Sequence, residues 1–338
     1  MDAQLRKVYP KNTVGDAFER FRLTNEWAKK PPRTREDWGR GWKYIEPVFG
    51  DMQAKAVTLE KLDRWYAHLV KLKGIGEAGR AMKTWRALYT VMAAMGLCQA
   101  KQDPSLAIRK TAVAGRTETW TDGEAVRLVK AAWRKGYKGL ACIIAVAWDT
   151  SFSPVDARSL TPNNAMSLGN DWAFVIQRGK TNEAAFGILS KRTRRLVEAY
   201  VADLDFELLD TAPIFRTKGY VPTEKGGRPR IGAPYQKNSL SADFREIRAL
   251  VFGTTEKRRL MDMRRTGAVE ANAGGAPVEA IAAKMGNSID QNKTLQKTYM
   301  PVNPAAVRAA EEARRIGRKK LSSEQNEFKK LKLVGGKS

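Results

Sequence analysis

Apolar residues recur at α-helical spacing through most of the first 95 residues, and this period limits the fold more than any other feature of the chain. The apolar positions are Val14, Phe18 and Phe21, then Trp38, Trp42 and Ile45, then Leu59, Leu62, Trp65, Tyr66 and Leu69. Residues three or four apart share one face of a helix, so each series predicts a helix with one buried side. Breaks at residues 29–33, 49–51 and 74–76 divide this segment into four predicted helices.

A second helical pattern follows residue 117 and contains one short β-like region. The predicted helices cover residues 122–135, 140–149, 191–204, 239–252, 263–273 and 278–285. Trp172, Phe174 and Ile176 alternate with other residues, and together with the segment 187–189 they predict a hairpin or small sheet. We therefore expect a mainly α fold with a small β-sheet.

The length of 338 residues, 43% of them hydrophobic, is enough for two separate cores. A basic stretch of low hydrophobicity after Asp103 and Pro104 predicts an exposed linker. We predict a helical first domain over residues 1–108, a linker over 109–117 and a second domain over 118–318. The lysine-rich end, 319–338, lacks a core-forming pattern and is expected to be a flexible tail.

The chain is strongly basic. It has 61 Lys and Arg against 36 Asp and Glu, a formal charge of +25, which favours a polyanionic partner such as nucleic acid. Within residues 77–96, Arg80, Lys83 and Arg86 lie on one predicted helix face, opposite an apolar stripe, and are candidate DNA-binding residues. The alternative interpretation of the same pattern is a solvated charged face.

Cysteine and histidine usage restricts the chemistry. Cys98 and Cys142 lie in apolar helical runs, which predicts buried free thiols in a reducing cytoplasm. His68 is the only histidine, and we expect it to be a surface or packing residue. The first seven residues lack an apolar signal core, and the longest apolar stretch, 141–148, is too short to span a bilayer. We expect a cytoplasmic protein with no metal site, no cofactor and no membrane partner.

Three short motifs follow one another near the carboxyl end. They are segment 262–268 (Asp-Met-Arg-Arg-Thr-Gly-Ala), segment 281–288 (Ile-Ala-Ala-Lys-Met-Gly-Asn-Ser) and the pair Thr298 and Tyr299. Their order and spacing resemble the tyrosine recombinase (phage integrase) family, whose members come from phages and mobile elements. The resemblance covers about residues 13–303. It implies a SAM-like helical core-binding domain followed by a catalytic domain of the DNA breaking-rejoining fold.

The resemblance also implies a reaction and its residues. Tyr299 matches the nucleophile, Arg264 the second catalytic arginine, and Lys180 the lysine of the β-hairpin. In such a reaction the phenolate attacks a DNA phosphate to form a 3′-phosphotyrosyl bond. Arginines stabilise the phosphate oxygens, and the lysine gives a proton to the leaving 5′ oxygen. The implied partner is double-stranded DNA, bound by a homotetramer during recombination and integration.

Three catalytic positions of the family pattern are substituted. Ser153 stands where the first catalytic arginine is expected, and Asp156 and Leu160 match the residues that flank that arginine. Met261 and Asn287 replace the two histidines, and only Asn287 can donate a hydrogen bond. Loss of one preorganised donor typically lowers the rate by roughly 10²- to 10³-fold.

Three hypotheses follow. The first is a site-specific recombinase or integrase, in which the predicted helix 304–318 either docks on a neighbouring protomer or simply caps its own domain. The second is a catalytically impaired, recombinase-like DNA-binding regulator or architectural protein. The third is a basic helical RNA-binding protein, which a preference for RNA over duplex DNA would reveal.

Overall fold

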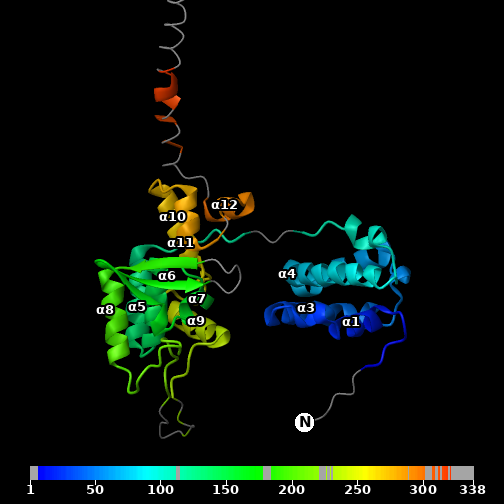
Figure 1. Ribbon diagram of the computed structural model, residues 1–338, viewed down its shortest axis with the longest axis horizontal. Coiled ribbons are helices and arrows are strands. Elements are labelled where there is room, and N and C mark those ends of the chain that lie inside the picture. Colours follow the sequence, from blue (N-terminus) through cyan, green and yellow to red (C-terminus); the bar gives the residue numbers. More distant parts are fainter. Residues whose placement is uncertain are drawn as a thin grey trace, which may run out of the picture. The chain divides into compact units, whose positions relative to one another are not determined.

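The computed structural model describes residues 7–111, 115–177, 184–220, 226, 229, 231–287 and 289–300, together with 307–308, 311–312, 314–318 and 320. The chain divides into two compact units, Met1–Gly115 and Arg116–Ser338 (Figure 1). The division falls inside the stretch 109–117 that the sequence marks as a linker. Of the predicted tail, only Lys320 is among the described residues, and Lys180 lies outside them.

The first unit is helical. Its elements are α1 (Val14–Arg22), α2 (Asn25–Ala28), α3 (Pro32–Phe49), η1 (Ala54–Ala56), α4 (Leu59–Ala94), η2 (Ala100–Gln102) and η3 (Pro104–Ala107). Thr13, Thr24 and Thr58 start α1, α2 and α4, because each side-chain oxygen accepts a hydrogen bond from a first-turn amide. The predicted breaks at 29–33 and 49–51 are confirmed, whereas the separation of α2 from α1 was not predicted.

Gly74 divides α4 into two helical segments. Its φ of 80° and ψ of 164° are far from helical values and are adopted readily only by glycine. The third break predicted from the sequence is therefore confirmed at this residue. The two segments pack with α1 and α3 around one core, in which Trp85 is fully buried and its ring centroid lies 5.1 Å from that of Phe49 in α3.

The second unit is mainly helical with one small sheet, as the sequence predicts. Its helices are α5 (Asp122–Arg134), α6 (Lys138–Thr150), α7 (Pro154–Arg158), η4 (Pro162–Asn164), α8 (Lys191–Ala202), α9 (Lys237–Phe252), α10 (Asp262–Ala273), α11 (Val278–Met285) and α12 (Lys293–Tyr299). The sheet is antiparallel in the order β1 (Ala165–Leu168), β2 (Asp171–Gln177) and β3 (Ala184–Leu189), with Trp172 opposite Leu189. Within the predicted helix 304–318, residues 307–308, 311–312 and 314–318 are helical.

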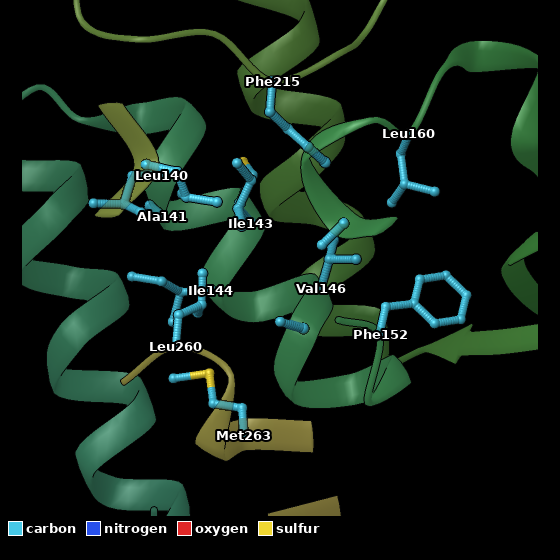
Figure 2. Close-up of a cluster of buried hydrophobic side chains, with 14 of the residues drawn as sticks. Leu140, Ala141, Ile143, Ile144, Val146, Phe152, Leu160, Phe215, Leu260 and Met263 are labelled. Atoms are coloured by element: carbon cyan, nitrogen blue, oxygen red, sulfur yellow. The ribbon is translucent and has the colours of Figure 1, made fainter. Parts of the chain in front are cut away.

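Helix α6 is the centre of the second core. Figure 2 shows its residues Leu140, Ile143, Ile144 and Val146 surrounded by side chains from other elements, and all four are fully buried. Full burial of such a side chain stabilises the fold by about 1.5–3 kcal/mol. Because most residues of α6 are buried, the helix is held firmly by its neighbours. Ser151, the residue that follows its last turn, accepts a hydrogen bond from Arg264.

Three predictions about single residues can be compared with the structure. Cys98 and Cys142 are buried free thiols, one in each unit, and His68 is exposed. Burial raises the pKa of the Cys142 thiol. None of the helices that the structure describes is long and apolar enough to cross a membrane.

Candidate functional site

Arg264 is held at the junction of α10, α6 and α11. Its side chain is 7% exposed, Nη1 donates to the Ser151 carbonyl at 2.8 Å, and Nη2 donates to the Met285 carbonyl at 2.6 Å. Ser151 is the C-cap of α6 and Met285 is the last residue of α11. The two carbonyls fix the orientation of the guanidinium relative to three helices.

The close approach of α10 to the end of α6 depends on a glycine. A Cβ at Gly267 would lie 2.0 Å from Ser151 Oγ, far inside contact distance. Ser151 itself has a left-handed backbone with φ 59°, and its buried hydroxyl has no hydrogen-bond partner among the described residues. Tight packing at Gly267 and Ser151 therefore fixes how closely α10, which carries Arg264, approaches the end of α6.

Ser153 acts as a local helix cap. Its Oγ accepts a hydrogen bond from Asp156 N at 3.4 Å and donates one to Asp156 Oδ2 at 2.6 Å, at the start of α7. The hydroxyl is neutral and is engaged with a carboxylate. Where the family resemblance implies an arginine, the structure has a capping serine.

The two positions that match family histidines have different surroundings. Met261 precedes α10, is 48% exposed and carries no hydrogen-bond donor on its side chain. Asn287 follows Gly286, which ends α11 with a left-handed φ of 53°, and Asn287 Oδ1 accepts a hydrogen bond from Ile289 N at 3.3 Å. The amide oxygen of Asn287 therefore stabilises the turn, and its NH₂ group is the part that could meet a ligand.

Tyr299 is the last residue of α12 and packs, half-buried, against a small apolar cluster. The buried members of this cluster come from α10, α11 and the turn after it, and they are Ala268, Ile281, Ala282, Met285 and Ile289. Figure 1 shows α10, α11 and α12 together at one end of the second unit. The elements that pack on this cluster contain Arg264 (α10), Asn287 (the turn after α11) and Tyr299 (α12), whereas Lys180 lies outside the described residues.

In the first unit, two of the three predicted DNA-binding residues make internal contacts. Arg80 Nη1 pairs with Asp37 at 2.6 Å. Arg86 donates to the Ser105 and Ile108 carbonyls at 2.5 and 2.8 Å, so it secures the chain that leaves α4. Lys83 is exposed, as expected for a residue that contacts phosphates.

A cleft of about 620 Å³ lies beside Lys83. Lys110, Trp38 and the glycines Gly76 and Gly79 also line it, and both glycines face open space. Burial lowers the pKa of Lys110, and the charges of Arg86 and Lys83 lower it further. Arg80 and its partner Asp37 also line the cleft, so Lys83 and Lys110 are the lining cations outside that ion pair. The sequence does not single out Lys110, because the basic stretch from residue 109 predicts a linker.

No protein-family model and no curated protein sequence matches this chain. Among solved structures, a lambda integrase dimer bound to a COC′ core site matches with a TM-score of 0.64 and 13% identity, covering 85% of this chain and 95% of that chain. The Tn1549 transposon integrase in complex with circular intermediate DNA matches with a TM-score of 0.65 and 11% identity, covering 88% and 98%. A lambda integrase tetramer bound to a Holliday junction matches with a TM-score of 0.65 and 12% identity, covering 86% and 79%.

At these identities the likeness establishes the fold. The chain has the architecture of these integrases over most of its length, so the fold implied by the motifs near the carboxyl end is confirmed.

Proposed function

We propose that the protein is a DNA-binding tyrosine recombinase that cleaves and rejoins DNA strands through Tyr299. The observation that carries the proposal is the packing of α10, α11, the turn after α11 and α12 on one apolar cluster, because these elements contain Arg264, Asn287 and Tyr299. The supporting observations are the integrase fold and the net charge of +25. Proteins with this fold have been captured on core-site, transposon and junction DNA, and we extend that partner to this chain.

The proposed reaction exchanges one phosphodiester for another. Tyr299 loses its phenolic proton to solvent and the phenolate attacks the scissile phosphorus; the bond to the 5′ oxygen breaks, and a 3′-phosphotyrosyl bond forms. The 5′ oxygen takes a proton, for which Lys180 is the proposed donor, and Arg264 stabilises the negative phosphate oxygens. Attack by a 5′-hydroxyl on the phosphotyrosyl bond reverses the sequence and rejoins the strand. The proposal needs no cofactor.

The substituted positions predict slow cleavage. Ser153, Met261 and Asn287 supply no positive charge, and loss of one preorganised donor typically costs about 2.7–4 kcal/mol of transition-state stabilisation. Such losses are not additive when the groups act together.

A second candidate function is a DNA-binding regulator or architectural protein that does not cleave. The observation that favours it is the engagement of the Ser153 hydroxyl with Asp156, which leaves a helix cap where the first arginine would bind phosphate.

On DNA, the proposed recombinase assembles into a homotetramer, by analogy with the integrase tetramer on a junction. We further propose that the protein acts in the cytoplasm.

In the first unit, Lys83 and Lys110 are proposed phosphate contacts, because both line the cleft of about 620 Å³.

A nicked suicide substrate tests the cleavage proposal. Wild type and the control Tyr44→Phe are expected to form a denaturation-resistant protein–DNA adduct on a pool of duplexes, and Tyr299→Phe is expected to form none. An adduct that persists in Tyr299→Phe would contradict the proposal. If wild type binds DNA without an adduct and Ser153→Arg forms one that depends on Tyr299, the protein is the non-cleaving form of the second candidate. Stronger binding to structured RNA than to duplex DNA in competition would contradict both candidates.

A further inference from the structure

The first residues of the second unit, 116–120, are tied to α10 and to the loop before it. Trp120 N donates to Thr266 Oγ1 at 2.9 Å, and Arg265 Nε donates to the Arg116 carbonyl at 3.2 Å. These partners are separated by 146 and 149 positions in the sequence. The chain that enters the second unit is therefore joined directly to the helix that carries Arg264.

The strongest of these contacts is the ion pair between Arg116 and Asp262. Arg116 Nε and Nη2 donate to the two carboxylate oxygens at 2.7 and 2.6 Å, and Arg259 N donates to Oδ2 at 2.7 Å. The Asp262 side chain is 2% exposed, and its hydrogen bonds raise the pKa of Arg116. A two-pronged pair fixes direction as well as distance, and a carboxylate this deeply buried is costly to leave unpaired. The pair therefore fixes the first turn of α10.

The contacts lie on one face of α10, opposite Arg264. At 3.6 residues per turn, successive residues are about 100° apart, so Asp262, Arg265 and Thr266 fall within about 100° of one another. Arg264 is about 200° from Asp262 on the same scale. Residues 116–120 thus hold one face of the helix while Arg264 projects from the other, toward the Ser151 and Met285 carbonyls. A shift or rotation of α10 at the Asp262 end would move the guanidinium off these carbonyls.

We propose that Arg116 is a positioning residue, which through Asp262 sets the rotation of α10 and so places the Arg264 guanidinium for DNA phosphate. The inference rests on the proposed function, in which Arg264 binds the scissile phosphate. Arg116 is the first residue of the second unit, so the pair ties the very start of this unit to α10.

A double-mutant cycle on DNA affinity tests the positioning role, because it needs no cleavage. The dissociation constant for a duplex is measured for wild type, Arg116→Ala, Arg264→Ala and the double variant. If Arg116 acts through Arg264, the loss caused by Arg264→Ala shrinks by a factor of about five or more in the Arg116→Ala background. Losses that multiply independently, or an Arg264→Ala variant that changes neither affinity nor adduct rate, would overturn the inference.

The cleavage assay provides a second readout. In single-turnover adduct formation, Arg116→Ala is expected to lower the maximal rate about tenfold or more while the DNA concentration at half-maximal rate changes about threefold or less. Arg116→Lys keeps the charge but loses the two-pronged geometry, so its rate is expected to lie between those of wild type and Arg116→Ala. A wild type that forms no adduct would refute the proposed cleavage, yet the affinity cycle would still decide the role of Arg116.

Two controls separate positioning from a general loss of structure. Arg194→Ala removes an exposed arginine that pairs with Glu198, one turn along the same helix, and lies 6.0 Å from the centroid of the Trp172 ring; it is expected to leave rate and affinity unchanged. If Arg116→Ala does not fold, Asp262→Asn and Arg116→Lys take its place in the cycle. Equal effects of Arg116→Lys and Arg194→Ala on the adduct rate would contradict the proposed role.

Discussion

At the scale of single residues, the site depends on the close packing of Ser151 against Gly267. Ser151 ends α6 in a left-handed conformation and offers its carbonyl to Arg264, while its hydroxyl lies against Gly267 of α10. The hydroxyl is buried and has no partner among the described residues, which is costly for a polar group. The close approach at Gly267 fixes the distance between α6 and α10, and the Arg116–Asp262 pair fixes the rotation of α10, so both contribute to the position of the guanidinium.

Gly267→Ala is expected to destabilise the second unit by about 1–3 kcal/mol, because the added methyl group would overlap Ser151 Oγ and force α10 away from α6. Urea unfolding measures the effect. Gly123→Ala, at a position with open space, is the matched control and is expected to be neutral or slightly stabilising. Ser151→Gly removes the overlapping atom, so the double variant should recover most of the loss. A double variant as unstable as Gly267→Ala would contradict this explanation.

At the scale of elements, Arg258 joins the loop before α10 to the start of α5. Its guanidinium pairs with Glu124 and Glu256, each at 2.7 Å, and lies 4.0 Å above the Trp120 ring. Hydrogen bonds from Arg258 lower the pKa of Glu256 to about 2 and also lower the pKa of Glu124. The loop, α5 and residues 116–120 are therefore held by one cationic side chain.

The stabilisation from Arg258 is expected to depend on pH. A carboxylate whose pKa is lowered by folding stabilises the fold fully above its unfolded pKa, about 4.5 here, and loses this contribution as the pH falls toward about 2. The difference in free energy of unfolding between wild type and Arg258→Met should therefore be constant near neutral pH and shrink below about pH 4.5. Arg194→Met, which removes an exposed pair, should show little difference at any pH. Denaturant unfolding from pH 7 to pH 3 checks both, and a difference that grows on acidification would refute the assignment.

At the scale of the whole molecule, a net charge of +25 predicts DNA affinity that falls steeply with salt. What the structure adds is a location for part of this charge, the cleft of the first unit with Lys83 and Lys110. Arg80, which lines the same cleft, and Arg86 are marked equally strongly by the sequence, but both have partners inside the unit. Charge counts alone do not separate these two groups of cations.

Lys83→Gln and Lys110→Gln are each expected to reduce the slope of log affinity against log salt by about 1, which is the loss of one phosphate contact. Both variants should weaken binding to all duplex sequences equally, because phosphate contacts carry no base information. Fluorescence anisotropy from 50 to 300 mM salt (roughly the range in which such slopes are measured) provides the test, with Lys61→Gln, outside the cleft, as the control. An unchanged slope in both cleft variants would contradict the proposal that the cleft contacts DNA.

Sequence alone predicted the fold class and most elements, because local periodicity determines them. The predicted helix 278–285 matches α11, and the predicted helix 140–149 lies inside α6. The side-chain contacts of the site could not be predicted from local periodicity. The pairing of Arg116 with Asp262 joins residues 146 positions apart, and no pattern around either residue identifies the partner. The capping role of Ser153 was also missed, although a serine directly before Pro154 at a helix start is a recognisable N-cap signal.

The two cysteines give each unit its own chemical reporter. Cys98 is 8% exposed in the first unit and Cys142 is 0% exposed in the second, and both are free thiols. A buried thiol reacts with an alkylating reagent only when the structure around it opens, so its modification rate measures local opening. Pulsed alkylation followed by peptide mapping would thus measure the rate of local opening in each unit separately, with and without DNA. The measurement uses the native sequence and needs no engineered label.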